Sequence, residues 1–487
     1  MRYELNTGWE FAVVDSHAQN GSADPVDFKK LTFLPATVPG CVELDLFAAG
    51  WEKDPYFGQN PYDYRYLEGK DFVYRIEFEA DPDMDRLRFA GIDTIADIFL
   101  NGERIGHTEN MFLEYDFPVS IRAGKNELAV CIYSPVLWAR RYDVPAFCNA
   151  QPFHFETLSV RKVASMYGWD ILPRFVSGGI FRPVTLEKKA DAALTTTGLF
   201  TLGIADNHRR ATLRLAWGFE TADALLDGYR VRITGVCGDR SFEKEADAAF
   251  TAGVMTLEVD APLLWYPRGY GEQPLYHVTV TLLKNDRILD AKTFDFGIRT
   301  VELVRTSATD AEGTGEFCFR VNGKKIFILG TNWVPLDAFP CRYAERLPKA
   351  LQELDDIGCN AVRVWGGGIY ESDAFYDFCD RKGILVWQDF CMGCATYPND
   401  AHMENALREE ATFIVRKLRN HPSLALWAGD NECDEAAKWN RYDPDPNRNT
   451  LTRKILPDVI RQEDFTRPYL PSSPYTDSEA FRTHGCL

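Results

Sequence analysis

The chain has 487 residues, enough for about three domains of ordinary size, and a formal net charge of −18 at pH 7. This acidic balance disfavours binding to nucleic acids and to anionic membrane surfaces, because both carry negative charge. The N-terminal sequence contains no apolar stretch of the signal-peptide kind, and no run of about 18 apolar residues occurs, so we expect a cytoplasmic protein without a membrane span. Twelve cysteines scattered along the chain favour reduced thiols over a disulfide framework.

Short apolar strands separated by turn residues fill the first 304 residues, with little helical periodicity. This pattern predicts a β-sandwich over residues 1–188 and an immunoglobulin-like β-sandwich over residues 189–304. The Asn101-Gly102 pair predicts a two-residue hairpin turn. Strands are expected at 72–78, 87–90, 95–100 and 127–133, and then at 211–217, 229–234, 254–259, 276–283 and 292–297.

The pattern changes near Glu316, where apolar strands begin to alternate with amphipathic helices. Repeated β-α units predict a parallel sheet, which is either an open doubly wound sheet or a TIM (β/α)₈ barrel. Polar or aromatic residues follow every strand, and this favours a barrel, whose active site draws on several strands. Strands are expected at 325–329, 361–365, 384–388 and 424–428, with a fifth candidate at 468–473, and helices at 347–357, 372–382 and 403–419. We therefore expect residues 305–487 to form an incomplete barrel.

The segment 423–435 joins a buried apolar strand to a cluster of acids and an amide, and Asn431 and Glu432 would lie at the carboxyl end of that strand. Glu432 and Asp389, at the ends of different strands, are a candidate pair for glycosidic bond cleavage. In that chemistry one acid protonates the leaving oxygen, and another carboxylate attacks or activates water. The alternatives are a solvated acidic loop at 430–432 and a structural hydrogen-bonding role for Asp389.

Other residues near the predicted strand ends each allow two interpretations. Arg363 either holds a neighbouring carboxylate ionised or forms a salt bridge at the barrel mouth. Trp333 and Trp365 are either platforms for a sugar ring or packing at the rim. Cys391 and Cys394 have the spacing of a redox or zinc pair, but no second pair lies nearby, so we expect no metal and no cofactor.

Several runs of sequence resemble the β-mannosidases of glycoside hydrolase family 2. They are Arg-Val-Trp-Gly-Gly-Gly-Ile-Tyr-Glu at 363–371, Val-Trp-Gln-Asp-Phe at 386–390, Cys-Ala-Thr-Tyr-Pro at 394–398 and Trp-Ala-Gly-Asp-Asn-Glu at 427–432. The likeness extends along the whole chain, because 38–40 and 54–58 resemble the family's jelly-roll, sugar-binding-like domain and 264–271 and 296–300 resemble its middle sandwich.

The resemblance implies retaining hydrolysis of terminal non-reducing β-mannosides without metal or organic cofactor. It makes Glu432 the general acid/base and Asn431 the residue that bonds the sugar 2-hydroxyl. The remaining substrate-binding candidates are Trp169, Asp170, Arg363, Trp365 and Asp389. The family usually continues Trp-Asp-Trp-Gly-Pro, whereas this chain has Ile171-Leu172 before Pro173, which changes that part of the subsite.

The family's nucleophile is a second glutamate on a late barrel strand, and no residue after Glu432 matches it. Glu435, Glu463 and Glu479 fall in helix or loop contexts. We therefore expect the nucleophile to be absent from the chain and the chain alone to show no mannosidase turnover. The alternatives are another family 2 β-glycosidase, namely a β-galactosidase or β-glucuronidase, and a catalytically dead carbohydrate-binding remnant. The oligomeric state is left open.

Overall fold

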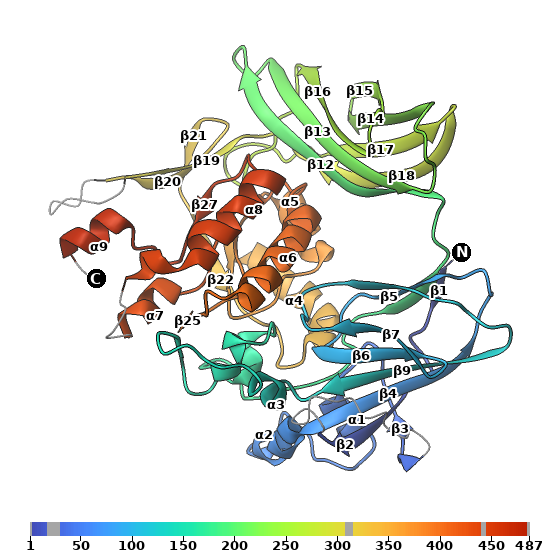
Figure 1. Cartoon of the computed structure of the whole chain (residues 1–487). Coiled ribbons are helices and arrows are strands. Elements are labelled where there is room, and N and C mark those ends of the chain that lie inside the picture. The colour runs from blue at the N-terminus through green and yellow to red at the C-terminus, as the bar shows by residue number, and fades with distance from the viewer. Residues whose placement is uncertain (1, 17–29, 307–314, 440–444, 485–487) are drawn as a thin grey trace.

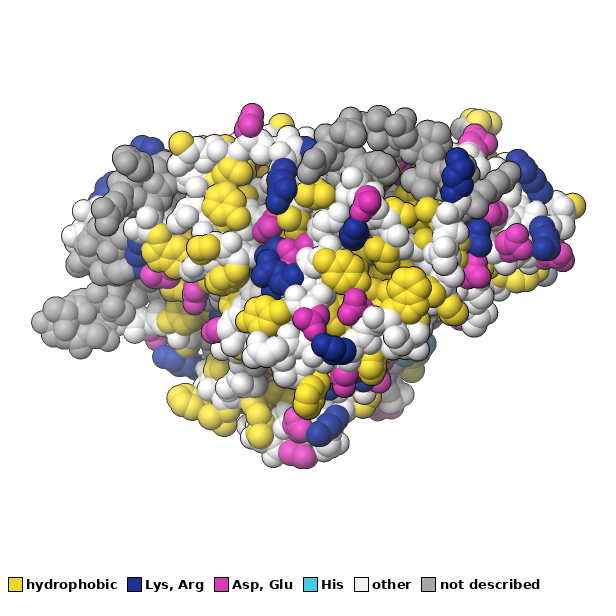
Figure 2. Space-filling view, turned by 90° about the horizontal axis from the view of Figure 1, so that it is seen from below, with side chains coloured by type: hydrophobic (Ala, Val, Ile, Leu, Met, Phe, Trp, Pro, Cys, Tyr) yellow, Lys and Arg dark blue, Asp and Glu magenta, His cyan; other side chains and the backbone are white. Residues whose placement is uncertain are grey.

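The computed structural model describes residues 2–16, 30–306, 315–439 and 445–484. Figure 1 shows one β-sandwich at the bottom, a second at the top, and a region of alternating strands and helices packed beside both. No helix in these residues is long and apolar enough to cross a membrane. On the face in Figure 2, basic side chains are interspersed with acidic and hydrophobic ones.

The first sandwich consists of a six-stranded and a four-stranded antiparallel sheet. Phe72, Tyr74, Ile76 and Phe78 alternate along β4 and pack into one apolar core, as the pleat of a strand requires. The hairpin turn predicted at Asn101-Gly102 joins β6 to β7. The larger sheet has the order β3 (Leu34–Pro35), β2 (Glu10–Asp15), β4 (Lys70–Glu79), β9 (Lys125–Tyr133), β6 (Ile95–Leu100), β7 (Glu103–Thr108), and the smaller has the order β1 (Arg2–Glu4), β11 (Val184–Glu187), β5 (Arg86–Phe89), β8 (Tyr115–Pro118).

Short helices and one short strand lie in the connections of the first sandwich. The segment 134–183, between β9 and β11, extends to the region of alternating strands and helices (residues 330–484). There its strand β10 (Asn149–Ala150) pairs with β25 (Ala395–Thr396). This pairing brings a connection of the first sandwich next to the predicted site. The helices are α1 (Val42–Ala48), α2 (Asn60–Asp63), η3 (Tyr64–Gly69), α3 (Pro135–Ala139), η4 (Phe155–Leu158) and η5 (Ala164–Tyr167).

The second sandwich has a three-stranded sheet facing a four-stranded sheet, the strand number of a compact immunoglobulin-like fold. Buried Val231 and Ile233 of β14 alternate with partly exposed residues, and the same period of two occurs in β13. The sheets have the orders β12 (Ala192–Ala205), β13 (Arg210–Thr221), β16 (Ala252–Asp260) and β15 (Arg240–Asp247), β14 (Tyr229–Cys237), β17 (Tyr276–Lys284), β18 (Arg287–Phe296).

A small antiparallel sheet of β19 (Val301–Arg305), β20 (Phe317–Val321) and β21 (Lys324–Ile326) connects the second sandwich to the parallel strands. The prediction of a barrel strand at 325–329 is wrong. β21 belongs to the hairpin with β20, and the first parallel strand is β22 (Gly330–Trp333). Asn332 and Trp333 therefore lie within a strand rather than after one.

The βα region (residues 330–484) contains a five-stranded parallel sheet whose strands follow one another in chain order. A doubly wound sheet would reverse its order at a switch point, so this order agrees with the predicted barrel. Every residue of β26 is buried, as predicted for a strand covered on both faces. The order is β22, β23 (Ala361–Val364), β24 (Leu385–Asp389), β26 (Leu424–Ala428), β27 (Tyr469–Leu470), and the helices are η6 (Pro340–Arg342), α4 (Tyr343–Asp356), α5 (Asp373–Lys382), α6 (Ala401–Leu418), α7 (Cys433–Trp439), η7 (Pro446–Arg448), η8 (Leu451–Ile455), α8 (Leu456–Glu463) and α9 (Ser478–His484).

A buried ion pair joins the first sandwich to the βα region. Arg161 donates to both carboxylate oxygens of Glu410 on α6, at 2.9 and 2.8 Å, and both side chains are almost fully buried. Asn110 and Tyr370 donate to the same carboxylate at 2.9 and 2.7 Å. Arg161 also donates to the carbonyl oxygen of Cys391, so the network fixes the segment that follows β24.

Candidate active site

The chain turns sharply between β26 and α7, and this turn presents the carboxylate of Glu432. A Cβ at Gly429 would lie 2.2 Å from the carbonyl oxygen of Pro471, so only glycine fits this first position of the turn. Glu432 has a left-handed backbone with φ of 60°, and its side chain is exposed. The thiol of Cys394 donates to Glu432 Oε2 at 3.1 Å. The structure thus places a solvent-accessible carboxylate at the carboxyl end of a central strand.

Arg363 links two of the predicted site residues from neighbouring strand ends. Its Nη2 donates to Asp389 Oδ2 at 2.6 Å and to Asn431 Oδ1 at 2.9 Å. Because guanidinium only donates, the Asn431 amide must turn its oxygen towards Arg363 and its NH₂ group away. Arg363 therefore sets the orientation of the side chain that we predict to bond the sugar.

Asp389 is enclosed by protein donors. Its side chain is fully buried and accepts hydrogen bonds from Arg363, from the backbone of Gly366 at 3.1 Å and from Trp387 Nε1 at 3.0 Å. Burial raises the pKa of Asp389 to about 6, and the Arg363 guanidinium opposes that rise. This geometry favours a structural hydrogen-bonding role for Asp389. A contact between Asp389 and the substrate stays a prediction.

Aromatic side chains from two distant parts of the chain meet at the candidate site. Trp169, from the 134–183 segment, meets Trp365 edge to face with ring centroids 5.1 Å apart. A Cβ at Gly367 would lie 2.1 Å from the Trp365 ring, which explains the glycine at this position. Asp170 and Ile171 are exposed beside Trp169.

Trp333 lies elsewhere. It is buried, its Nε1 donates to Glu371 Oε1 at 2.9 Å, and it packs on Phe375 in the core. Of the two interpretations of Trp333, packing is the one that the structure supports.

His154 is a site residue that the sequence did not reveal. It is completely buried, packs 4.8 Å from the Trp169 ring, and lies against the backbone of Gly393 and Cys394. Burial lowers the pKa of His154 to about 4, so the imidazole is neutral at pH 7. Nothing in the local sequence distinguishes it from any other histidine, because its neighbours come from a distant part of the chain.

The other glutamates considered for the nucleophile have ordinary roles on helices. Glu463 accepts from Arg416 at 2.7 Å and from Arg419 at 2.8 Å, and Glu435 accepts from Lys438 at 2.6 Å. Glu479 lies on α9. The nucleophile thus stays unassigned.

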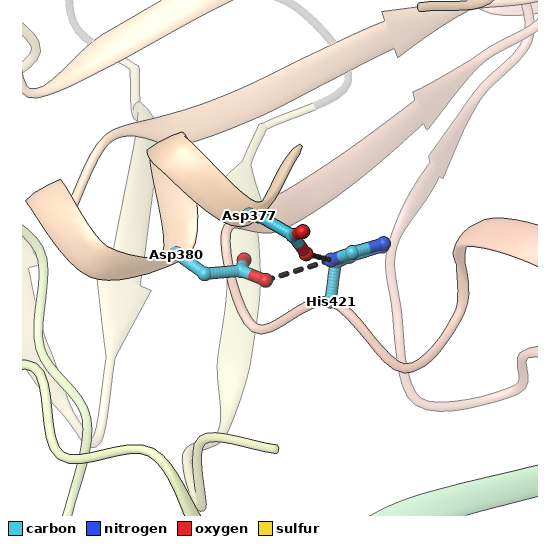
Figure 3. A group of neighbouring side chains, drawn as sticks. All are labelled: Asp377, Asp380 and His421. Atoms are coloured by element: carbon cyan, nitrogen blue, oxygen red, sulfur yellow. Dashed lines mark hydrogen bonds and ion pairs between the residues drawn. The ribbon is translucent and has the colours of Figure 1, made fainter. Parts of the chain in front are cut away.

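Figure 3 shows Asp377, Asp380 and His421, which have the residue types of a metal site. His421 Nδ1 lies 2.7 Å from Asp380 Oδ2 and 4.0 Å from Asp377 Oδ1. Asp380 Oδ1 also accepts from the backbone of Ser423, the residue directly before β26. The group therefore lies at the opposite end of β26 from Glu432, and it fits a structural link between α5 and this strand.

A cavity of about 870 Å³ extends along the inner face of the parallel sheet. Its walls are mainly apolar and include Ala361, Leu385 and Ala425, while Arg363 and Asn332 are among its polar residues. Since Arg363 also contacts Asn431, this cavity borders the candidate active site.

Two β-sandwiches followed by β-α units, with a carboxylate at a strand end beside tryptophans, define the class of multidomain glycoside hydrolases. Three family models match successive parts of the chain: the glycosyl hydrolase 2 galactose-binding domain-like model over 9–182, the glycosyl hydrolases family 2 model over 200–299, and the family's TIM barrel domain over 315–470. The chain belongs to glycosyl hydrolases family 2. These matches confirm the predicted family and fold class.

Similar proteins include β-mannosidases. The chain is 34% identical to the β-mannosidase of Bos taurus, over 94% of this chain and 54% of that protein, and 33% identical to β-mannosidase B of Aspergillus clavatus, over 98% and 58%. The crystal structure of β-D-mannosidase from Dictyoglomus thermophilum matches with a TM-score of 0.85 and 33% identity, covering 99% of this chain and 58% of that one. The chain thus spans a little over half the length of these relatives. An exo-chitosanase of Amycolatopsis orientalis, at 19% identity and a TM-score of 0.69, shares the fold.

Proposed function

We propose that the whole protein is a β-mannosidase that releases terminal non-reducing β-D-mannose from β-mannosides. The observation that carries the proposal is the group of Arg363, near the carboxyl end of β23, and Asn431 and Glu432, directly after β26, with Trp169 and Trp365 beside it. The relatives named above are β-mannosidases, and their similarity to this chain supports the same substrate class.

In this proposal the carboxyl group of Glu432 donates its proton to the leaving glycosidic oxygen as the bond to the anomeric carbon breaks. The amide of Asn431, oriented by Arg363, bonds the 2-hydroxyl of the mannose. Trp365 and Trp169 bound the sugar ring through their apolar faces and edges.

A nucleophilic carboxylate, whose residue is not yet assigned, attacks the anomeric carbon and forms the covalent glycosyl-enzyme. Glu432, now ionised, then takes a proton from the water that hydrolyses it. The mechanism needs no metal and no organic cofactor.

The test is a substrate panel. We expect the whole protein to hydrolyse 4-nitrophenyl β-mannoside with a higher kcat/KM than the β-galactoside or β-glucuronide. A preference for either of the last two would overturn the mannoside assignment in favour of another family 2 glycosidase, and failure to hydrolyse any of them would favour a carbohydrate-binding role. The cytoplasmic location is also a proposal, and cell fractionation tests it.

A further inference from the structure

Cys394 contacts two of the predicted polar residues of the site, Glu432 and Asn431. Its thiol donates to Glu432 Oε2 at 3.1 Å, and Asn431 Nδ2 donates to the same sulfur at 3.5 Å. The thiol thus lies between the amide that Arg363 orients and the carboxylate that would protonate the leaving group.

The backbone fixes the position of this thiol. Cys394 N donates to Asn431 O at 2.8 Å, and Asn431 N donates to Met392 O at 2.9 Å. Backbone hydrogen bonds in both directions therefore join the segment 392–394 to Asn431 in the turn after β26. Cys394 has a left-handed backbone with φ of 47°, a conformation that non-glycine residues keep only where the surroundings impose it.

The first sandwich supplies part of those surroundings. The residue after Cys394 begins β25, which pairs with β10 of the 134–183 segment. His154 from the same segment lies against the backbone of Gly393 and Cys394. Arg161 holds the carbonyl oxygen of Cys391 at 2.9 Å.

The thiol is suited to donate rather than to act as a thiolate. Cys394 is only 7% exposed. Burial, followed by the bond to Glu432, raises the pKa of the Cys394 thiol well above its usual range, so the proton stays on sulfur at neutral pH.

We propose that Cys394 is a positioning residue for the general acid: its S–H group engages Oε2 of Glu432, so that Oε1 carries the proton that goes to the leaving oxygen. The inference rests on the proposed function of Glu432. A thiol held by Asn431 also keeps the acid at a fixed place relative to the residue that binds the sugar.

Kinetics of the whole protein test the proposal. Cys394→Ala should lower kcat/KM about tenfold on phenyl β-mannoside, whose leaving group needs the proton, because a hydrogen bond to a charged group contributes about that factor. It should leave kcat/KM on 2,4-dinitrophenyl β-mannoside nearly unchanged, and Cys394→Ser, which restores an O–H donor, should recover most of the loss. The matched control is Cys379→Ala, which replaces a fully buried cysteine on α5. It should leave kcat/KM unchanged on both substrates. Equal losses on both substrates, or the same loss in Cys379→Ala, would overturn the proposal.

A Raman measurement separates this inference from the proposed function. The difference spectrum of the parent minus Cys394→Ser isolates the S–H stretching band of Cys394, which we expect at the lower frequency of a hydrogen-bonded thiol. In a Glu432→Ala background the same difference band should move to higher frequency. That shift supports the contact even if the substrate panel fails, whereas an unshifted band overturns the inference even if the protein hydrolyses mannosides.

Discussion

Replacing Glu410 with alanine should destabilise the contact between the first sandwich and the βα region more than most single substitutions. Glu410 is fully buried, and its carboxylate accepts four hydrogen bonds, two of them from Arg161. Removing it leaves the Arg161 cation buried without its anionic partner, and leaves Asn110 and Tyr370 without their acceptor.

The expected loss is about 3 to 5 kcal/mol in the free energy of unfolding, the range for removing one partner of a buried ion pair. Urea titrations followed by tryptophan fluorescence measure it, by comparison of transition midpoints. The matched control is Glu409→Ala, the same substitution at the neighbouring exposed position of α6, which should change stability by no more than about 0.5 kcal/mol. The double variant Arg161→Met/Glu410→Leu should be more stable than Glu410→Ala, since it leaves no uncompensated charge. A loss below about 1 kcal/mol, or an equal loss in Glu409→Ala, would refute the reasoning.

Three further predictions concern the candidate site. Glu432→Gln in the whole protein should lower kcat/KM on phenyl β-mannoside by about 10²- to 10⁴-fold while sparing the dinitrophenyl substrate, because only the former needs an acid; an equal loss on both would argue against the acid role. Asp389→Asn should lower kcat/KM about tenfold on both substrates, since it weakens the ionic bond that places Arg363 and, through it, Asn431; a loss confined to phenyl β-mannoside would instead make Asp389 part of the proton transfer. His154 has a folded pKa of about 4, below the unfolded value of about 6.5, so it contributes stability that is present above pH 6.5 and is lost as pH falls towards 4. Between pH 7 and 5 the free energy of unfolding of the parent should therefore fall by about 2 kcal/mol more than that of His154→Gln. If the free energy of unfolding depends on pH identically in the two proteins, the burial of a neutral imidazole is contradicted.

Local sequence predicted those elements whose signals are themselves local. The apolar run 424–428 stands between His421-Pro422 and Gly429, and β26 has those bounds. The same logic failed at 325–329, where an apolar run after a hairpin suggested a parallel strand. There the parallel partner of β23 is the more polar segment Gly330–Trp333, because tertiary pairing decides which residues join the sheet.

Some residues of the candidate site could likewise be predicted from local sequence, and others could not. Arg363 lies in the last part of the predicted strand 361–365, and Asn431 and Glu432 follow the predicted strand 424–428, so their meeting could be anticipated from the shared edge of a parallel sheet. The contribution of the first sandwich could not, because it depends on contacts between distant residues. Arg161 and Glu410 are 249 positions apart, and His154 reaches Cys394 across a similar interval. Packing between domains, rather than any local pattern, places these groups.

The measurement that tests the central claim most directly is a ¹H NMR time course of aryl β-mannoside hydrolysis by the whole protein and by its Glu432→Gln variant. If Glu432 is the acid/base of a retaining β-mannosidase, mannose appears first as the β-anomer and later mutarotates, and the variant releases it far more slowly from phenyl β-mannoside. Release of α-mannose first, or an unchanged rate in the variant, would contradict the account.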